Sequence, residues 1–142
     1  MRRSTRRSDQ AGQALVEWAA SAFVLLLFAL GILAVALVVQ EYRAVREAAS
    51  QAAFAAARAP SSQTAQVTGG RTGLEALQGT QVESAVVTVD VGDFRRGGVV
   101  VASVHGYVSL GAFPIVSQLL GARFPLHYEA RALIEPYRSR SG

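Results

Sequence analysis

The stretch from Trp18 to Gln40 carries no formal charge and is strongly apolar, and it restricts the possible folds more than any other feature of this chain. Its central run is apolar on every face of a helix, without the polar stripe that a surface helix of a globular protein carries. At about 1.5 Å per residue, the 23 residues reach ~35 Å, which exceeds the roughly 30 Å of a membrane's hydrocarbon core. The stretch therefore predicts one transmembrane helix, with residues 19–39 in the membrane.

The basic residues predict how this helix is oriented. All 14 basic residues are arginines, and four of them precede the apolar stretch, whereas the two that closely follow it lie among acidic residues. Because cytoplasmic loops carry the excess of basic residues, we expect a cytoplasmic N-terminus and an exported C-terminal part at the inner (cytoplasmic) membrane. Without the N-terminal segment the chain is nearly neutral, which argues against a nucleic-acid surface. The four arginines of that segment are Arg2, Arg3, Arg6 and Arg7.

A cleavable secretory signal fits the N-terminus less well than a permanent membrane helix does. The apolar region of such a signal spans about 7–15 residues and ends near a small-residue cleavage site. Here the apolar run is longer and continues into further helix-forming sequence. The paired arginines also suggest a twin-arginine signal, but the apolar residues expected directly after such a pair are missing.

The junction before the apolar stretch reads Gly12-Gln13-Ala14-Leu15-Val16-Glu17. A basic leader ends in glycine, and an acid stands five residues further on, at the start of the apolar helix. This arrangement resembles the prepilin processing site of type IV pilins, where a membrane aspartic peptidase cuts after the glycine. The resemblance implies cleavage between Gly12 and Gln13, which makes residues 1–12 a removable leader and Glu17 the fifth residue of the mature chain.

The spacing of this junction has a chemical rationale. Cleavage after Gly12 creates an α-amine on Gln13 that is positively charged below a pKa of roughly 8. Gln13 and Glu17 are four residues apart and therefore share one face of a helix. A carboxylate at the edge of hydrocarbon is costly, so an ammonium in its own or a neighbouring chain stabilises it. In pilin-like assemblies such pairing is thought to set the axial register between subunits.

An alternative reading of the junction stays open, and two of its residues depart from the pilin pattern. Glu17 can be the polar border of an ordinary membrane helix, and Gly12 a loop residue. Mature type IV pilins often begin with phenylalanine or methionine, so Gln13 leaves N-methylation undecided. Trp18 stands where the Flp/Tad branch often has a tyrosine after the acid, although an amphipathic indole also suits any membrane interface.

Beyond the membrane stretch, the helix is predicted to continue to Ala59, because eight of the twelve residues from Ala48 to Ala59 are alanine. Two stripes of small residues at four-residue spacing suit close packing, or else alanine merely fills a solvated helix. Residues 60–73 are rich in turn-forming types and predict a loop, followed by a short helix over 74–78. The domains expected are a leader (1–12), a long helix (13–59) and an exported β-rich part (60–142).

The exported part shows the two-residue periodicity of half-buried strands. Val87, Val89 and Val91 alternate with polar residues, and a turn at 95–98 leads into a second strand. Residues 113–120 predict a connector with one or two helical turns before the third strand. We expect an α+β fold, with a small antiparallel sheet covered by the alanine-rich part of the helix. The predicted buried faces are Val100, Ala102, Val104, Val108 and Leu110 in the second strand, and Phe124, Leu126, Tyr128, Ala130, Ala132 and Ile134 in the third.

This order of leader, GQALVE junction, long alanine-rich helix and β-rich tail resembles the TadE-like family of minor pilins or pseudopilins from tight-adherence (Tad) systems; the β region alone fits a TadF-like subgroup equally. The resemblance implies a pilin-like fold and a structural role in a type IV-like pilus. It also implies prepilin peptidase, other pilins, an inner-membrane assembly platform and membrane lipid as partners. The alternative is an uncleaved, single-pass, membrane-anchored binding module.

The sequence contains no pattern that predicts catalysis. It has no cysteine and no lysine, which excludes thiol nucleophiles, Walker-type phosphate loops and Schiff-base chemistry. We predict no catalytic residue, no cofactor and no metal, and hence a protein that is not an enzyme. A metal held by His105, His127 and Glu129 is conceivable, but exposed histidines are more often solvated. The acids Glu83, Asp90 and Asp93 fit solvated turns and strand edges.

Overall fold

The computed structural model describes residues 5–134, with side chains from Gly12 onward. Arg2 and Arg3 of the predicted leader and residues 135–142 lie outside the described residues, as do the side chains of Arg6 and Arg7. The elements are α1 (Thr5–Ala57), α2 (Ser62–Ala76), β1 (Val82–Asp90), β2 (Val99–Ser109), α3 (Pro114–Leu120) and β3 (Arg123–Leu133).

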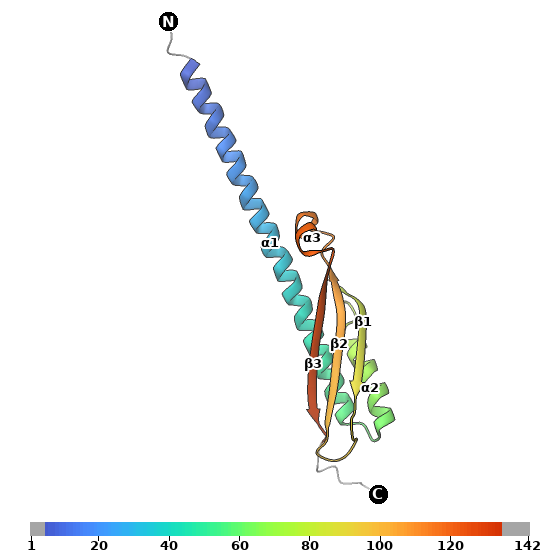
Figure 1. Ribbon diagram of the computed structural model, residues 1–142. Coiled ribbons are helices and arrows are strands. Elements are labelled where there is room, and N and C mark those ends of the chain that lie inside the picture. The colour runs from blue at the N-terminus through green and yellow to red at the C-terminus, as the bar shows by residue number, and fades with distance from the viewer. Residues whose placement is uncertain (1–4, 135–142) are drawn as a thin grey trace.

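Helix α1 is the axis of the molecule. Its 53 residues extend about 80 Å at 1.5 Å per residue. Figure 1 shows that only its C-terminal half lies beside the other elements, while the N-terminal half projects away from them. The helix is long and apolar enough to cross a membrane, and little of its most apolar window is buried within the protein. It is therefore a candidate membrane anchor.

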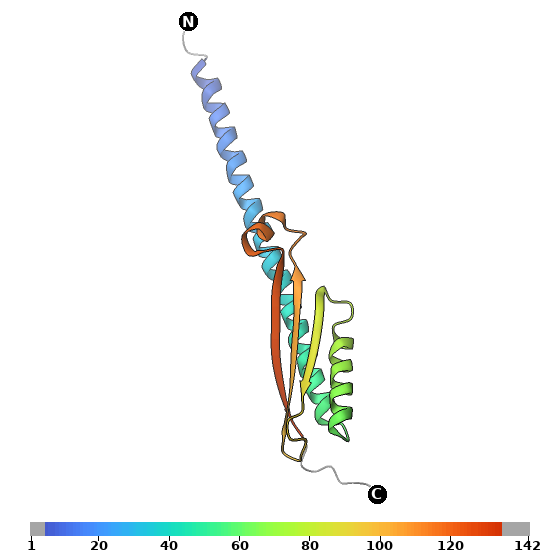
Figure 2. The same cartoon turned by 45° about the vertical axis from the view of Figure 1, so that its right-hand side comes forward.

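The three strands form one antiparallel sheet in the order β1-β2-β3. The C-terminal half of α1 lies against β2 and β3, and α2 lies against β1, so that both helices cover one face (Figures 1 and 2). The predicted α+β fold, with a long N-terminal helix on a small antiparallel sheet, is confirmed. The predicted buried faces of the second and third strands are confirmed too, because each residue named there is buried or half-buried.

The alanine stripes in the second half of α1 lie in the protein core and do not face solvent. Ala48, Ala52 and Ala56 are fully buried, and so is the neighbouring stripe through Val45 and Ala49. At the middle of β3, Tyr128 meets Tyr42 of α1 edge to face, with ring centroids 6.0 Å apart. Of the two readings of the alanine stripes, close packing is therefore the correct one.

The prediction of a loop over residues 60–73 is wrong, because Ser62–Ala76 forms α2. The Ser61 side chain accepts a hydrogen bond from the Thr64 backbone N–H (3.3 Å) and caps the helix. The glycines that suggested a turn form the contact between the two helices. A Cβ on Gly69 would lie 2.9 Å from the Ala52 carbonyl oxygen, and one on Gly73 would lie 2.8 Å from Val87. Glycine thus lets α2 approach the alanines of α1, which outweighs its low helix propensity.

Connector α3 (Pro114–Leu120) joins β2 to β3 at the end of the sheet nearer the N-terminal half of α1 (Figure 2). Its seven residues confirm the predicted helical connector between these strands. The turn predicted at 95–98 is present at the opposite end, where Gly97 adopts a positive φ of 75°. The sheet domain therefore carries a helical connector at one end and a hairpin turn at the other.

Candidate functional site

The predicted processing junction lies on the projecting half of α1. The helix passes through Gly12 without a break, and every residue from Gly12 to Ala20 is exposed. A Cβ at Gly12 would meet nothing within 4 Å. Glycine in a helix interior costs about 1 kcal/mol relative to alanine, so Gly12 lowers the energy needed to unwind the helix there. The peptide bond between Gly12 and Gln13 is accordingly accessible, and unwinding the helix there to fit a protease cleft costs less free energy than at a non-glycine residue.

Glu17 and Trp18 are both exposed on this half of the helix, with Trp18 at 73% exposure. Gln13 and Glu17 stand one helical turn apart on one face, as their spacing predicts. Within residues 12–134, whose side chains the structure describes, Glu17 has no ion-pair partner. An exposed carboxylate at the start of an apolar helix is available to a cation from outside the chain.

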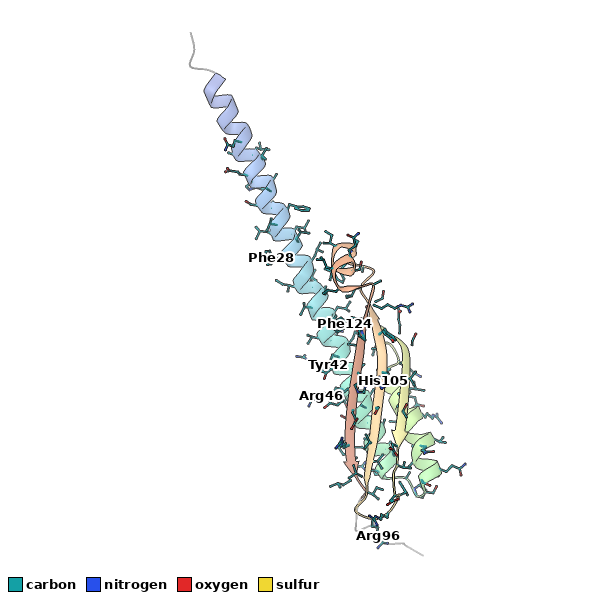
Figure 3. All side chains as sticks on the ribbon, in the orientation of Figure 1. Phe28, Tyr42, Arg46, Arg96, His105 and Phe124 are labelled. Carbon is teal, nitrogen blue, oxygen red and sulfur yellow. The ribbon has the colours of Figure 1, made fainter. Side chains whose placement is uncertain are left out.

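The surface that follows Glu17 is made of large apolar side chains. Phe23, Leu25, Phe28 and Ile32 are each at least 57% exposed, and Figure 3 shows Phe28 on the part of the helix that projects beyond the sheet. Monomeric soluble proteins rarely expose contiguous apolar surface on this scale. This exposed apolar surface is what a membrane anchor presents, which agrees with the length and composition of α1.

Glu41 is a buried acid that the sequence reasoning treated only as the end of the apolar stretch. Its side chain is 3% exposed, and its Oε2 accepts a hydrogen bond from the Gln81 backbone N–H at 3.1 Å. The bond joins α1 to the start of β1 across 40 positions of sequence. The residues on either side, Gln40 and Tyr42, are exposed, so no local sequence pattern marks Glu41 as buried.

His105 and His127 are brought together, as their positions on neighbouring strands suggested. They form a direct cross-strand pair, and their rings stack with centroids 4.1 Å apart. Glu129, the third member of the conceivable metal site, instead accepts hydrogen bonds from Arg131 at 2.9 and 3.0 Å. Among residues 5–134, no group of three or more His, Cys, Asp or Glu side chains is placed to hold a metal ion.

The acids that sequence reasoning assigned to solvated edges are not assembled into a paired site. Glu83 lies 3.6 Å from Arg123 Nε in an ion pair between exposed side chains. Asp90 accepts a hydrogen bond from the Gly92 backbone N–H at 2.9 Å and so caps a turn. Both contacts are local surface interactions, as expected for acids at turns and strand edges.

The fold and the exposed junction together define a class: an α+β protein with a projecting apolar N-terminal helix whose second half is the spine of a small sheet domain. Residues 12–53 match the family of TadE-like proteins. The matched segment begins at Gly12 and covers most of α1. Residues 12–53 are thus similar to TadE-like proteins, which agrees with the resemblance that the junction and the helix carry. No curated protein and no solved structure matches the chain significantly.

Proposed function

We propose that the chain is a minor pilin or pseudopilin, a structural or assembly component of a Tad-type, type IV-like pilus, and not an enzyme. The observation that carries this proposal is the projecting half of α1. It exposes a glycine junction, an acid without a partner in the described part of the chain, and a continuous apolar surface. A helix with these features is suited to two successive environments, the lipid bilayer and a bundle of similar helices.

In the first environment, residues 19–39 anchor the chain in the inner membrane. The arginine-rich leader stays in the cytoplasm, and the sheet domain is exported. Prepilin peptidase removes residues 1–12 by cutting between Gly12 and Gln13. The accessible Gly12 and its low cost of unwinding support this step.

In the second environment, apolar helices of other pilins or pseudopilins replace the lipid around α1. The Glu17 carboxylate then pairs with the α-amine of Gln13 in its own or an adjacent subunit, which fixes the axial register. Trp18 packs beside this pair. The inner-membrane assembly platform moves the subunit from lipid to filament, where the sheet domain is extracellular.

The proposal is tested by the N-terminus of the chain in cells that contain a prepilin peptidase. Mass spectrometry of the purified protein should give a mature chain that begins at Gln13. Gly12→Leu should block cleavage, because the peptidase cleft must accept this residue next to the cut bond. The matched control is Gly31→Leu, which changes a second glycine of α1 that has open space around it and should leave cleavage intact.

The assembly role of Glu17 needs a separate measurement. Glu17→Val should be cleaved like the parent chain but should reduce incorporation into pili at least tenfold, as measured by immunoblotting of sheared filaments. Glu47→Val, on the exposed surface of the other half of α1, is the control and should assemble normally. If Glu17→Val assembles normally, the proposal that Glu17 sets the axial register between subunits is wrong.

A membrane-anchored binding module that keeps its leader is the second candidate. The observation in its favour is the open face of the sheet, which exposes Val86, Tyr107 and Leu133 at 57%, 43% and 67%. Recovery of the chain with Met1 still attached, from cells whose peptidase processes other prepilins, would favour this candidate.

A further inference from the structure

Helix α3 is an exposed apolar element in a stretch without charge. None of its residues is buried, and Ile115, Leu119 and Leu120 are 44%, 79% and 61% exposed. No Asp, Glu, Lys or Arg occurs from Gly106 to Ala122. A short surface connector between two strands is usually polar, so this composition requires a cover that residues 5–134 do not provide.

The position of α3 indicates what this cover is. An apolar groove of about 720 Å³ lies between α3 and α1. Figures 1 and 2 show α3 alongside α1 where the helix leaves the sheet domain, and Figure 3 places Phe28 on α1 beside α3 and Phe124 at the end of β3 next to α3. The groove is lined on α1 by residues between Leu27 and Val39, and on the other side by Leu110, Val116, Leu119, Leu120 and Phe124.

The same α1 residues belong to the proposed membrane span, which sets the depth of α3. With Glu17 at the cytoplasmic edge of the hydrocarbon, a core of roughly 30 Å extends for about 20 helical residues, to about residue 37. The α1 wall of the groove therefore lies in the exported half of the bilayer. Interfacial helices lie about 5–10 Å below the membrane surface, a depth that corresponds to the last two turns of α1 before residue 37. Helix α3 is held at this level by its contact with α1.

The polar groups of the connector are compatible with a membrane interface. The Ser117 hydroxyl donates to the Pro114 carbonyl oxygen at 2.9 Å, and Pro114 has no N–H to satisfy. The Leu110 N–H donates to the Ala122 carbonyl oxygen at 2.9 Å, closing the base of the connector. The first charged residue after this base is Arg123, paired with Glu83. Charge thus begins at the edge of the sheet, one residue beyond the apolar connector.

We propose that α3 is a second membrane-contacting element, whose Leu119 and Leu120 insert into the exported leaflet while lipid acyl chains fill the groove beside α1. This inference rests on the proposed membrane anchorage of α1. The continuity of the groove with the span argues for lipid as its occupant. Two contacts, one through α1 and one through α3, fix the orientation of the sheet domain on the membrane before the subunit joins a filament.

The experiment uses single-cysteine variants, since the chain has no cysteine of its own. Leu119→Cys reports on α3, Phe28→Cys on the span, and Leu133→Cys on an exposed apolar position of β3 outside the groove. Each full-length variant carries a small environment-sensitive fluorophore. It is reconstituted at less than one chain per vesicle into phosphatidylethanolamine–phosphatidylglycerol vesicles, with or without nitroxide-labelled acyl chains.

Nitroxide lipid should quench the probes at 119 and 28 at least threefold more than the probe at 133. In the Leu119→Cys variant, a second substitution, Leu120→Asp, should reduce the quenching at least twofold. The control substitution Leu133→Asp, on β3 outside the groove, should leave the quenching at 119 unchanged. Quenching at 28 but not at 119 would overturn the inference and leave the anchor standing. No quenching at 28 would overturn the anchorage of α1 itself. If the fluorophore at 119 reports an apolar environment only at high protein density, a second copy of the chain occupies the groove, and the proposal that lipid occupies it is wrong.

Discussion

The two halves of α1 form one continuous helix but are built from different side chains. The projecting half exposes large residues such as Phe23, Leu25 and Phe28, whereas the half on the sheet buries alanines such as Ala52 and Ala56. Hydropathy separates the halves, because no charged residue occurs from Trp18 to Gln40 whereas four occur from Glu41 to Glu47. The size of the apolar side chains separates them as well, because a helix can approach a sheet and a second helix closely only where its own residues are small.

This difference indicates what covers each half. Where the cover is folded with the helix, its shape is fixed and the helix carries side chains that fit it, as Ala52 fits against Gly69 and Gly73 of α2. Where the cover is lipid or another subunit, no partner within the chain restricts volume, and large residues maximise the apolar area removed from water. The boundary lies near Glu41, the buried acid that joins α1 to the start of β1.

The largest expected difference between the two halves of α1 comes from replacing a small residue with a large one in each half. Ala52→Leu should destabilise the sheet domain by about 3 kcal/mol, because Ala52 is fully buried and faces two glycines of α2. Urea unfolding of the full chain in detergent, followed by the near-ultraviolet circular dichroism of the tyrosines, measures the free energy of unfolding.

Ala29→Leu is the matched control in the projecting half, where Ala29 is exposed. It should leave the free energy of unfolding of the sheet domain unchanged. Equal destabilisation by the two substitutions would mean that side-chain size does not distinguish the halves.

The contrast between the halves could be predicted only in part from sequence. The apolar stretch, the alternation of Val100 to Leu110 and the alanine stripe sufficed for the helix, the strands and the covered face. Helix α2 was missed because turn propensity at Gly69 and Gly73 was weighed without their four-residue spacing to Ala65, which places all three on one buried face. Small residues at four-residue spacing, such as Ala65, Gly69 and Gly73, thus indicate a helix packed against another helix more strongly than the glycines indicate a turn.

For the candidate site, the linear junction of Gly12, Gln13, Glu17 and Trp18 could be named from sequence because its spacing along one helix needs no tertiary information. Glu41 and the groove beside α3 could not. Each depends on which distant segment folds against α1: the start of β1 for Glu41, and the β2–β3 connector for the groove. Such contacts between distant segments leave only a weak trace in composition.

Two adjacent glycines of α2 test the close packing in the second half of α1, because Gly69 faces α1 and Gly70 faces away from it. Gly69→Ala should destabilise the sheet domain by about 2 kcal/mol, because the new Cβ would lie 2.9 Å from both the Ala52 carbonyl oxygen and the Ala56 Cβ. Gly70→Ala meets nothing within 4 Å and should stabilise α2 by up to ~1 kcal/mol. Thermal unfolding in detergent compares the two, and a shift of the same sign for both would contradict the close contact of the helices.

The smallest effect is expected at the boundary between the halves. Glu41→Leu removes the acceptor of the Gln81 N–H and leaves a part-buried donor without a partner, which should cost about 1 kcal/mol. Glu41→Gln keeps a carbonyl oxygen at the same position and should recover at least half of that loss. Hydrogen exchange at the Gln81 amide provides the local measurement: protection should fall in the leucine variant and persist in the glutamine variant. If both variants keep full protection, the bond from Glu41 does not hold the start of β1 against α1, and the boundary between the two halves is set by apolar packing around Val45 and Leu77 alone.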